Sequence, residues 1–279
     1  MSVVTGADEI AAALEAAEPD AQLAAIALVA RNPDTRLSEA AVGALMRCLG
    51  AQSKAVRRHA AEAAAIAAPH NPAIVSALHA LLASVTRRAQ FGAAYALGLI
   101  GDDAFDLRAA DALYHALGDA DGDVRWAAHD LIMRLGGEYP AEVRTGLLTL
   151  AHGGAADARK MALYCLRDLA PAGAEVLHAA TLASAADDTH VRLASLAILA
   201  RLPAYRQEAS AIAARILESD PNPGVRRAAA AALGLINDAS PQVLEVLERA
   251  ASRELDPGLS RAARAALKRL AENQTEPER

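Results

Sequence analysis

The sequence predicts an all-α fold, a right-handed α-solenoid of about eight two-helix repeats. Alanine, the residue with the highest helix propensity, accounts for 74 of the 279 residues, whereas aromatic residues make up only 3%. One pattern recurs about every 34 residues, and each copy carries apolar or small residues at the spacing of one helix face. The composition excludes a β-sandwich or barrel, which needs β-branched and aromatic residues on its pleated faces.

The recurring pattern is clearest in the copies that begin at Val56, Val124, Val191 and Val225. Eight copies start at residues 21, 56, 89, 124, 158, 191, 225 and 259, so the spacing stays between 33 and 35 residues. With the start residue as position 0, positions 0, +4, +7 and +11 share one helical stripe. Position +4 is alanine in seven copies and serine in one, which predicts close helix contacts there. Positions +2, +5, +6 and +9 are expected to point away from the core.

A second helical segment precedes each copy and has its own start and stop signals. Pro72 begins one segment that runs to about Ala83, Pro140 begins another that ends near Gly153, and Pro241 begins a third. Neither helix of such a pair can bury its apolar face alone, so the pairs should stack side by side. We expect one solenoid over residues 1–272, followed by a polar C-terminal tail over residues 273–279.

The repeat carries the motif Asp-x-x-Val-Arg-x-x-Ala-x-x-x-Leu-Gly, clearest at Asp121–Leu135 and Asp188–Leu202. It resembles the HEAT-like repeat family, in particular the short repeats first named from phycobilisome lyases, over about residues 7–271. The resemblance implies an armadillo-like superhelix whose second helices line the concave surface. It also implies that the turn Asp and the Arg at +1 pair along the stack. Because Gln22, Gln90 and Ser260 replace that Arg, an unbroken ladder is not expected. The Arg is kept at Arg57, Arg125, Arg159, Arg192 and Arg226.

Charge and cysteine content limit the function classes. The formal net charge is −6, whereas a general nucleic-acid binder usually carries excess Lys and Arg. Cys48 and Cys165 form no CxxC motif, which argues against a disulfide framework or zinc site and fits a reducing compartment. The first residues lack a signal-peptide pattern, and no apolar run is long enough for a membrane span. The sequence therefore predicts a cytoplasmic protein.

No catalytic motif is present, because GxGxxG, Walker A, GxSxG and HExxH are all absent. The deoxyhypusine hydroxylases, an enzyme family with HEAT repeats, build a di-iron site from His-Glu dipeptides. This chain has none, and only His129-Asp130 comes near. We therefore expect no catalytic residues, no metal and no cofactor. Cys165 is expected as a buried core residue, and Cys48 either as a buried residue or as a reactive thiol at a helix end.

Large side chains gather at the outward positions of the third to fifth copies, and six of the eight aromatic residues lie between positions 91 and 139. We expect a partner-binding patch on the concave face, centred on Trp126, because aromatic residues, Met and Arg are enriched in interface cores. Alternatively, these side chains only cover their own helices. The patch comprises Phe91, Tyr95, Trp126, His129, Asp130, Met133, Lys160, Tyr164 and Arg167, and a secondary basic patch comprises Arg227, Arg261, Arg264 and Lys268.

These observations favour a non-enzymatic scaffold or adaptor that binds a protein or peptide on its concave face. Two alternatives stay open. The family resemblance suggests an accessory subunit of a chromophore or cofactor lyase or maturation system. The basic residues of the last two copies suggest a nucleic-acid-binding HEAT-like protein. The sequence specifies neither the partner nor the oligomeric state.

Overall fold

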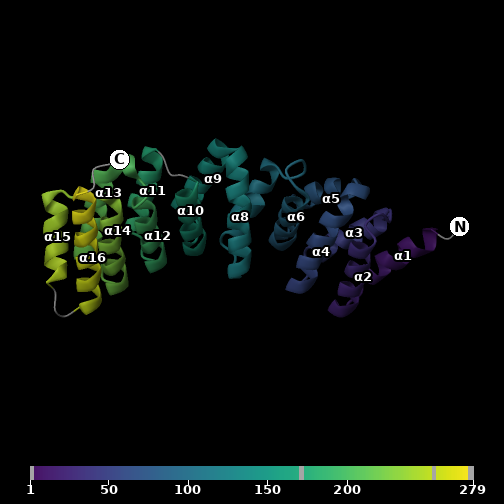
Figure 1. Cartoon of the computed structure of the whole chain (residues 1–279). Coiled ribbons are helices and arrows are strands. Elements are labelled where there is room, and N and C mark those ends of the chain that lie inside the picture. Colours follow the sequence, from purple (N-terminus) through teal and green to yellow (C-terminus); the bar gives the residue numbers. More distant parts are fainter. Residues whose placement is uncertain (1–2, 170–172, 253–255, 276–279) are drawn as a thin grey trace. The chain divides into compact units, whose positions relative to one another are not determined.

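A computed structural model describes residues 3–169, 173–252 and 256–275, and all regular elements in these ranges are helical (Figure 1). They comprise sixteen α-helices and three short 3-10 helices, which confirms the predicted all-α solenoid class with two helices per repeat. The chain divides into two compact units, Met1–Tyr139 and Pro140–Arg279.

Each unit is a stack of alternating first and second helices. Unit 1 contains α1 (Val3–Leu14), α2 (Pro19–Arg31), α3 (Glu39–Cys48), α4 (Lys54–Ala67), α5 (Ala73–Leu81), α6 (Arg87–Ile100), α7 (Ala110–Ala116) and α8 (Gly122–Glu138). Unit 2 contains α9 (Pro140–Gly153), α10 (Ala156–Asp168), α11 (Ala174–Ser184), α12 (Thr189–Leu199), α13 (Arg206–Ser219), α14 (Pro223–Ile236), α15 (Pro241–Ala251) and α16 (Pro257–Thr275). The even-numbered helices are the second helices of the repeats, and each begins two residues before its predicted start.

Side-chain caps explain where several second helices begin. The hydroxyl of Ser53 accepts a hydrogen bond from the Val56 amide at the start of α4. Asp121 and Asp188 cap α8 and α12 in the same way, and Asn222 caps α14. A cap satisfies one of the amides that a helix leaves without an intrahelical partner, so it fixes the first turn. Each of these four residues stands three positions before the start of its copy, so the caps fall at the same point of the repeat.

The predicted +4 column lies in the core. Ala60, Ala93, Ala128 and Ala229 are fully buried, and Ser195 replaces the alanine at the same depth. Each of these small side chains lets a second helix approach the helices beside it; α4, for example, contacts both α2 and α6. The sequence prediction of close helix contacts at +4 is confirmed.

The expectation that position +5 points outward is wrong. Ala230 is fully buried, and His129 exposes only 7% of its surface. A second helix packs against its own first helix and also against the second helices on both sides, so its buried arc is wider than one stripe. Of the four positions expected to point outward, +2, +6 and +9 remain on the open side. Position +10 joins them, because Ile66, Leu99 and Leu235 are exposed there. We call this side the open face.

The +1 column has one shared role, which the sequence motif only partly indicates. Arg57, Arg125, Arg192 and Arg226 each donate to two carbonyl oxygens of the preceding turn, for example Arg57 to the carbonyls of residues 51 and 52, both at 2.8 Å. The residues that replace this arginine do likewise. Gln22, Gln90 and Ser260 donate to the carbonyls of Leu14, Ser84 and Ala251.

The arginines of this column thus satisfy carbonyls of the turn that joins each first helix to its second helix, and Gln22 and Ser260 satisfy the carbonyl of the last residue of a first helix. Pairing between repeats is less regular. Arg192 forms a buried ion pair with Asp220 at 2.7 Å, whereas the Arg226–Asp256 pair is longer, at 3.8 Å. The implied Asp–Arg ladder is therefore restricted to part of unit 2 among the described residues.

Two further points concern the chain as a whole. Helix α16 runs to Thr275, so residues 273–275, expected as part of a tail, are helical. Among the described residues, none of the helices combines the length and apolarity that crossing a lipid bilayer requires.

Candidate partner-binding site

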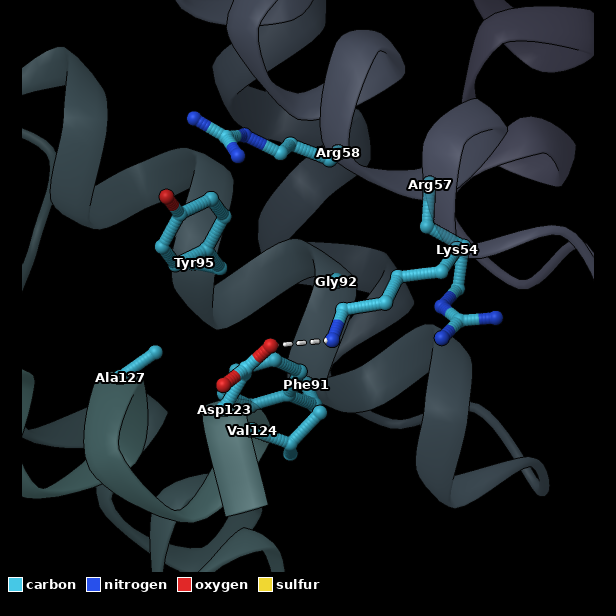
Figure 2. A pocket seen from close by; sticks show the side chains of 9 residues that line it. All are labelled: Lys54, Arg57, Arg58, Phe91, Gly92, Tyr95, Asp123, Val124 and Ala127. Carbon is cyan, nitrogen blue, oxygen red and sulfur yellow. Dashed lines mark hydrogen bonds and ion pairs between the residues drawn. The ribbon is translucent and has the colours of Figure 1, made fainter. Parts of the chain in front are cut away.

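A hollow on the open face of unit 1 lies between α4, α6 and α8. It has a volume of about 240 Å³, and we call it the α4–α6–α8 pocket (Figure 2). Three successive second helices build it, so its residues come from segments about 34 positions apart. It is lined by Lys54, Arg57, Arg58, Phe91, Gly92, Tyr95, Asp123, Val124 and Ala127.

The apolar part of the pocket comes from α6 and α8. Phe91 and Tyr95 are one helical turn apart on α6, at positions +2 and +6, and their rings stack with centroids 6.0 Å apart and planes inclined by 28°. Val124 and Ala127 add aliphatic surface from α8. Both aromatic side chains are half-buried, so each leaves part of its ring available to a ligand.

Gly92 explains how α6 comes so close to the end of α3. A Cβ atom at this position would lie 2.6 Å from the carbonyl oxygen of Leu49 and 2.9 Å from its Cβ. Those distances are shorter than van der Waals contact, so a larger residue would push α6 away. The glycine thereby holds Phe91, its neighbour in the chain, against the rest of the pocket.

Charged residues form the rim of the pocket. The Lys54 ammonium lies 2.6 Å from the Asp123 carboxylate, and these side chains point toward each other in Figure 2. It also lies 2.9 Å from the Asp121 carboxylate. Hydrogen bonds to Asp123 and Asp121 raise the pKa of Lys54, and the Lys54 ammonium in turn lowers the pKa of Asp121. Lys54 is therefore held in its protonated form.

The two arginines of the rim differ in what holds them. Arg57 donates to backbone carbonyls of its own turn, and burial, more than repulsion from Arg88, lowers its pKa. Arg58 forms an exposed ion pair with Glu62 at 3.0 Å, and this hydrogen bond raises its pKa. Exposed pairs contribute little stability, so Arg58 can exchange Glu62 for a ligand carboxylate at small cost.

The other predicted patch residues of unit 1 lie on α8. Trp126 exposes 53% of its surface and packs edge-on against the His129 ring, with centroids 5.4 Å apart. His129 is buried below it and does not belong to the open face, which corrects its place in the predicted patch. Asp130 is exposed and lies 3.2 Å from His129, and Met133 is half-buried at +9.

The remaining predicted patch residues lie in unit 2, on α10. The Arg167 guanidinium lies over the Tyr164 ring at 5.0 Å from its centroid and also pairs with Asp168. Lys160 forms an ion pair with Asp157 one turn earlier on the helix. The predicted patch is thus divided between the two units, and within unit 2 its cations have local acidic partners.

The predicted basic patch lies at the end of unit 2, and all four of its residues are exposed. Arg227 on α14 lies 3.8 Å from Asp256, and Lys268 on α16 lies 3.7 Å from Glu272. Arg264 donates to the carbonyl of Ala251, at 3.2 Å. Arg261 has no hydrogen-bond or ion-pair partner within the described part of the chain.

Sequence reasoning missed Lys54, Arg57 and Val124 as pocket residues. Val124 occupies position 0, which belongs to the core stripe. Arg57 occupies position +1, which the repeat motif associates with the turn. Lys54 precedes its copy by two residues. All three sit at the N-terminal ends of second helices, where neighbouring repeats leave the core partly open. A search for charged residues just before position 0 would have found Lys54.

Other chemistry-bearing residues do not gather into a site. Within the described ranges, no group of three or more His, Cys, Asp or Glu side chains could hold a metal ion. Cys48 is buried, and burial raises the pKa of its thiol despite the charge of Arg47. A reactive thiolate at this position is therefore disfavoured. Cys165 is fully buried, as predicted.

Comparison with known proteins supports the repeat assignment in unit 2. The profile of the HEAT repeats family matches residues 174–268. A search of curated proteins found no match to this sequence.

Solved structures with a similar fold share little sequence identity with this chain. Kap95p, solved with RanGDP, has a TM-score of 0.62 and 14% identity, over 99% of this chain and 42% of that one. Importin beta has a TM-score of 0.61 and 15% identity, over 96% and 41%. An engineered protein has a TM-score of 0.51 and 17% identity, over 96% and 79%. The chain thus spans about two fifths of the Kap95p and importin beta chains.

Proposed function

We propose that this chain is a non-catalytic interaction scaffold that binds a peptide segment of a protein partner on the open face of unit 1. The observation that carries this proposal is the α4–α6–α8 pocket, where stacked Phe91 and Tyr95 form an apolar surface beside a charged rim. Kap95p, which shares the fold, binds RanGDP, so this architecture can serve protein binding. By analogy with HEAT-like solenoids, the open face would be the concave one.

The size of the pocket favours a peptide side chain over a small molecule. Sites for drug-sized ligands typically enclose about 300–1,000 Å³, whereas this pocket holds about 240 Å³. That volume suits one large apolar side chain, such as Phe, Leu or Met. The rim suits the flanking residues of the same peptide, with a carboxylate toward Arg58 and a cation toward Asp123.

The rim chemistry argues against catalysis in the pocket. A lysine that acts as nucleophile or base needs a lowered pKa. Asp123 and Asp121 instead raise the pKa of Lys54 and keep its ammonium protonated. The ion pair is better suited to fixing the rim and to discriminating between charged ligands.

Trp126 extends the proposed surface along α8. It lies next to Ala127 of the pocket lining, and its ring is exposed while its neighbour Ala128 is buried. A docked peptide would cover the ring, as interface aromatics commonly are. Trp126 is also the only tryptophan of the chain, so its fluorescence reports binding directly.

The test begins with a displayed library of random twelve-residue peptides, selected on the intact chain. We expect a consensus with one large apolar residue, and a blue shift of Trp126 fluorescence when the synthetic peptide binds. Phe91→Ala and Trp126→Ala should each weaken binding about thirtyfold, measured by the anisotropy of a fluorescently labelled peptide, because truncating an anchor costs about 2 kcal/mol or more. Ala127→Met, which fills the pocket without removing a core side chain, should do the same.

The control is Ala231→Ser, which changes an exposed residue of unit 2. Thermal unfolding should confirm that every variant folds. If the selected peptides bind the Ala127→Met chain as tightly as the unmodified chain, the pocket is not the binding site. If no consensus emerges, the proposal of peptide recognition fails.

A further inference from the structure

Unit 2 carries a second hollow on its open face, over α12 and α14, which we call the α12–α14 groove. Its volume is about 760 Å³, roughly three times that of the α4–α6–α8 pocket. The sequence pattern does not indicate this hollow, because the sixth and seventh copies show small residues at their outward positions. Those small residues are what create the hollow.

The floor of the groove is apolar. Five alanines and three leucines line it, and no aromatic residue does so. Ala197 and Ala231, at position +6 of neighbouring helices, leave room for an approaching backbone. Leu193 and Leu235 stand beside them, and Leu235 exposes 50% of its surface although it is large and apolar. An exposed leucine beside small residues is a suitable surface for an apolar ligand face.

The rim of the groove is positively charged. Arg167, Arg201 and Arg269 contribute three guanidinium groups, and Asp168 contributes the one carboxylate, which already pairs with Arg167. The Arg201 and Arg269 side chains are exposed and have neither an ion-pair nor a hydrogen-bond partner in the part of the chain that the structure describes. This excess of positive charge lies in a chain whose net charge is −6.

We propose that the α12–α14 groove binds an amphipathic helix with an apolar stripe and acidic flanks. An apolar stripe with anchors at i, i+3, i+4 and i+7 would lie along the floor. Glu or Asp side chains on its flanks would pair with Arg201 and Arg269, whose planar guanidinium groups donate two parallel hydrogen bonds to a carboxylate. Helices pack about 8–10 Å apart depending on the side chains between them, and alanines permit the shorter distances.

The same arginines could attract a nucleic acid, but the floor favours a protein helix. Single-stranded nucleic acid is held by aromatic side chains on which bases stack, together with a basic groove. The floor offers alanine and leucine instead. This second surface lies in the other unit and does not depend on peptide binding in the α4–α6–α8 pocket.

The probe is a synthetic eighteen-residue peptide with leucines on one helical face and glutamates on the flanks, labelled for fluorescence anisotropy. Two matched peptides serve as controls, one with lysines for the glutamates and one with a scrambled order that breaks the leucine stripe. The full chain should bind the acidic peptide, more weakly at high salt because exposed charges are screened. It should bind both control peptides at least tenfold more weakly.

Variants of the chain locate the site. Changing Arg201→Glu and Arg269→Glu together should weaken binding of the acidic peptide at least tenfold, because the double change replaces attraction with repulsion. Ala231→Phe should weaken it by filling the floor without altering charge. The charge-reversal control is Arg215→Glu, which changes an exposed arginine of unit 2 outside this groove and should leave affinity within twofold when applied alone. Peptides selected for the α4–α6–α8 pocket should bind all of these variants normally.

Three results would overturn the proposal. The first is equal affinity of the acidic peptide for the double variant and the Arg215→Glu chain. The second is equal binding of the lysine-flanked peptide. The third is a uridine twenty-mer that binds more tightly than the peptide and loses affinity in the Arg201 and Arg269 variant, which would assign the groove to nucleic acid.

Discussion

Replacing Gly92 with alanine should destabilise unit 1, although the same change normally stabilises a helix. In a helix interior, Gly→Ala is favourable by about 0.5–1 kcal/mol, because glycine loses more conformational freedom on folding. At Gly92 the added Cβ would lie 2.6 Å from the Leu49 carbonyl oxygen and 2.9 Å from the Leu49 Cβ. Leu49 is fully buried, so it cannot move aside easily. Overpacking of this kind costs about 1–3 kcal/mol.

Gly43 provides a matched control in the same unit. It lies inside α3, and a Cβ there would meet only the far end of the Arg47 side chain at 3.6 Å, an ordinary contact. Gly43→Ala should therefore stabilise by about 0.5–1 kcal/mol. The helix-propensity gain is common to both variants, so the difference between them isolates the packing cost of about 1–3 kcal/mol at Gly92.

Urea unfolding followed by the fluorescence of Trp126 measures this difference, because the only tryptophan of the chain lies in the same unit. The urea concentration at the unfolding midpoint should rise for Gly43→Ala. It should be lower for Gly92→Ala than for Gly43→Ala. The slope of the unfolding free energy against urea concentration should be the same for both variants. Equal shifts for the two variants would refute the close approach of α6 to the end of α3. They would also remove the reason why the pocket needs a glycine.

Three further predictions concern the core. Ala229→Leu should destabilise by about 1–3 kcal/mol in chemical denaturation, whereas Ala231→Leu on the open face should change little; equal effects would contradict the helix register. Arg192→Met should lower the free energy of unfolding by about 3–5 kcal/mol, because it leaves the Asp220 carboxylate buried without its cation. A decrease below about 1 kcal/mol would show that the pair is solvated. An aromatic disulfide reagent should modify Cys48 only after unfolding, because burial raises its pKa; rapid reaction of the native chain would contradict this.

The periodicity of the sequence was sufficient to predict the helices. The +4 alanines, the capping residues before several second helices and the prolines at the start of several first helices repeat with the structure, so local signals determine element type and phase. The +1 column shows the limit of motif reading. Gln90 and Ser260 look like departures from the arginine pattern, yet they donate to the same kind of carbonyl. The repeat requires a donor at this position, and the sequence motif displays only its commonest form.

The breadth of the buried arc could not be predicted from one helix. A helical stripe predicts the direction of the core, but Ala230 and His129 are buried by neighbouring helices that the stripe does not describe. The sequence pointed correctly to Phe91, Tyr95 and Trp126 as large side chains on the open face. The sequence pattern placed His129 on that face in error. Position +5 lies about 100° around the helix from +4, so it falls outside the predicted stripe. The helices stacked on either side nevertheless bury it.

The sequence by itself therefore determined the helical repeat, its phase and the residue types available on the open face. Tertiary structure alone decided where that face is hollow. The α4–α6–α8 pocket depends on how closely α6 approaches Leu49 at Gly92, and it joins side chains from three repeats. The α12–α14 groove arises where small side chains of adjacent helices lie beside Arg167, Arg201 and Arg269. Hydrophobic periodicity encodes the direction of each side chain from its own helix axis, whereas a cavity depends on the distances between axes, which only packing sets.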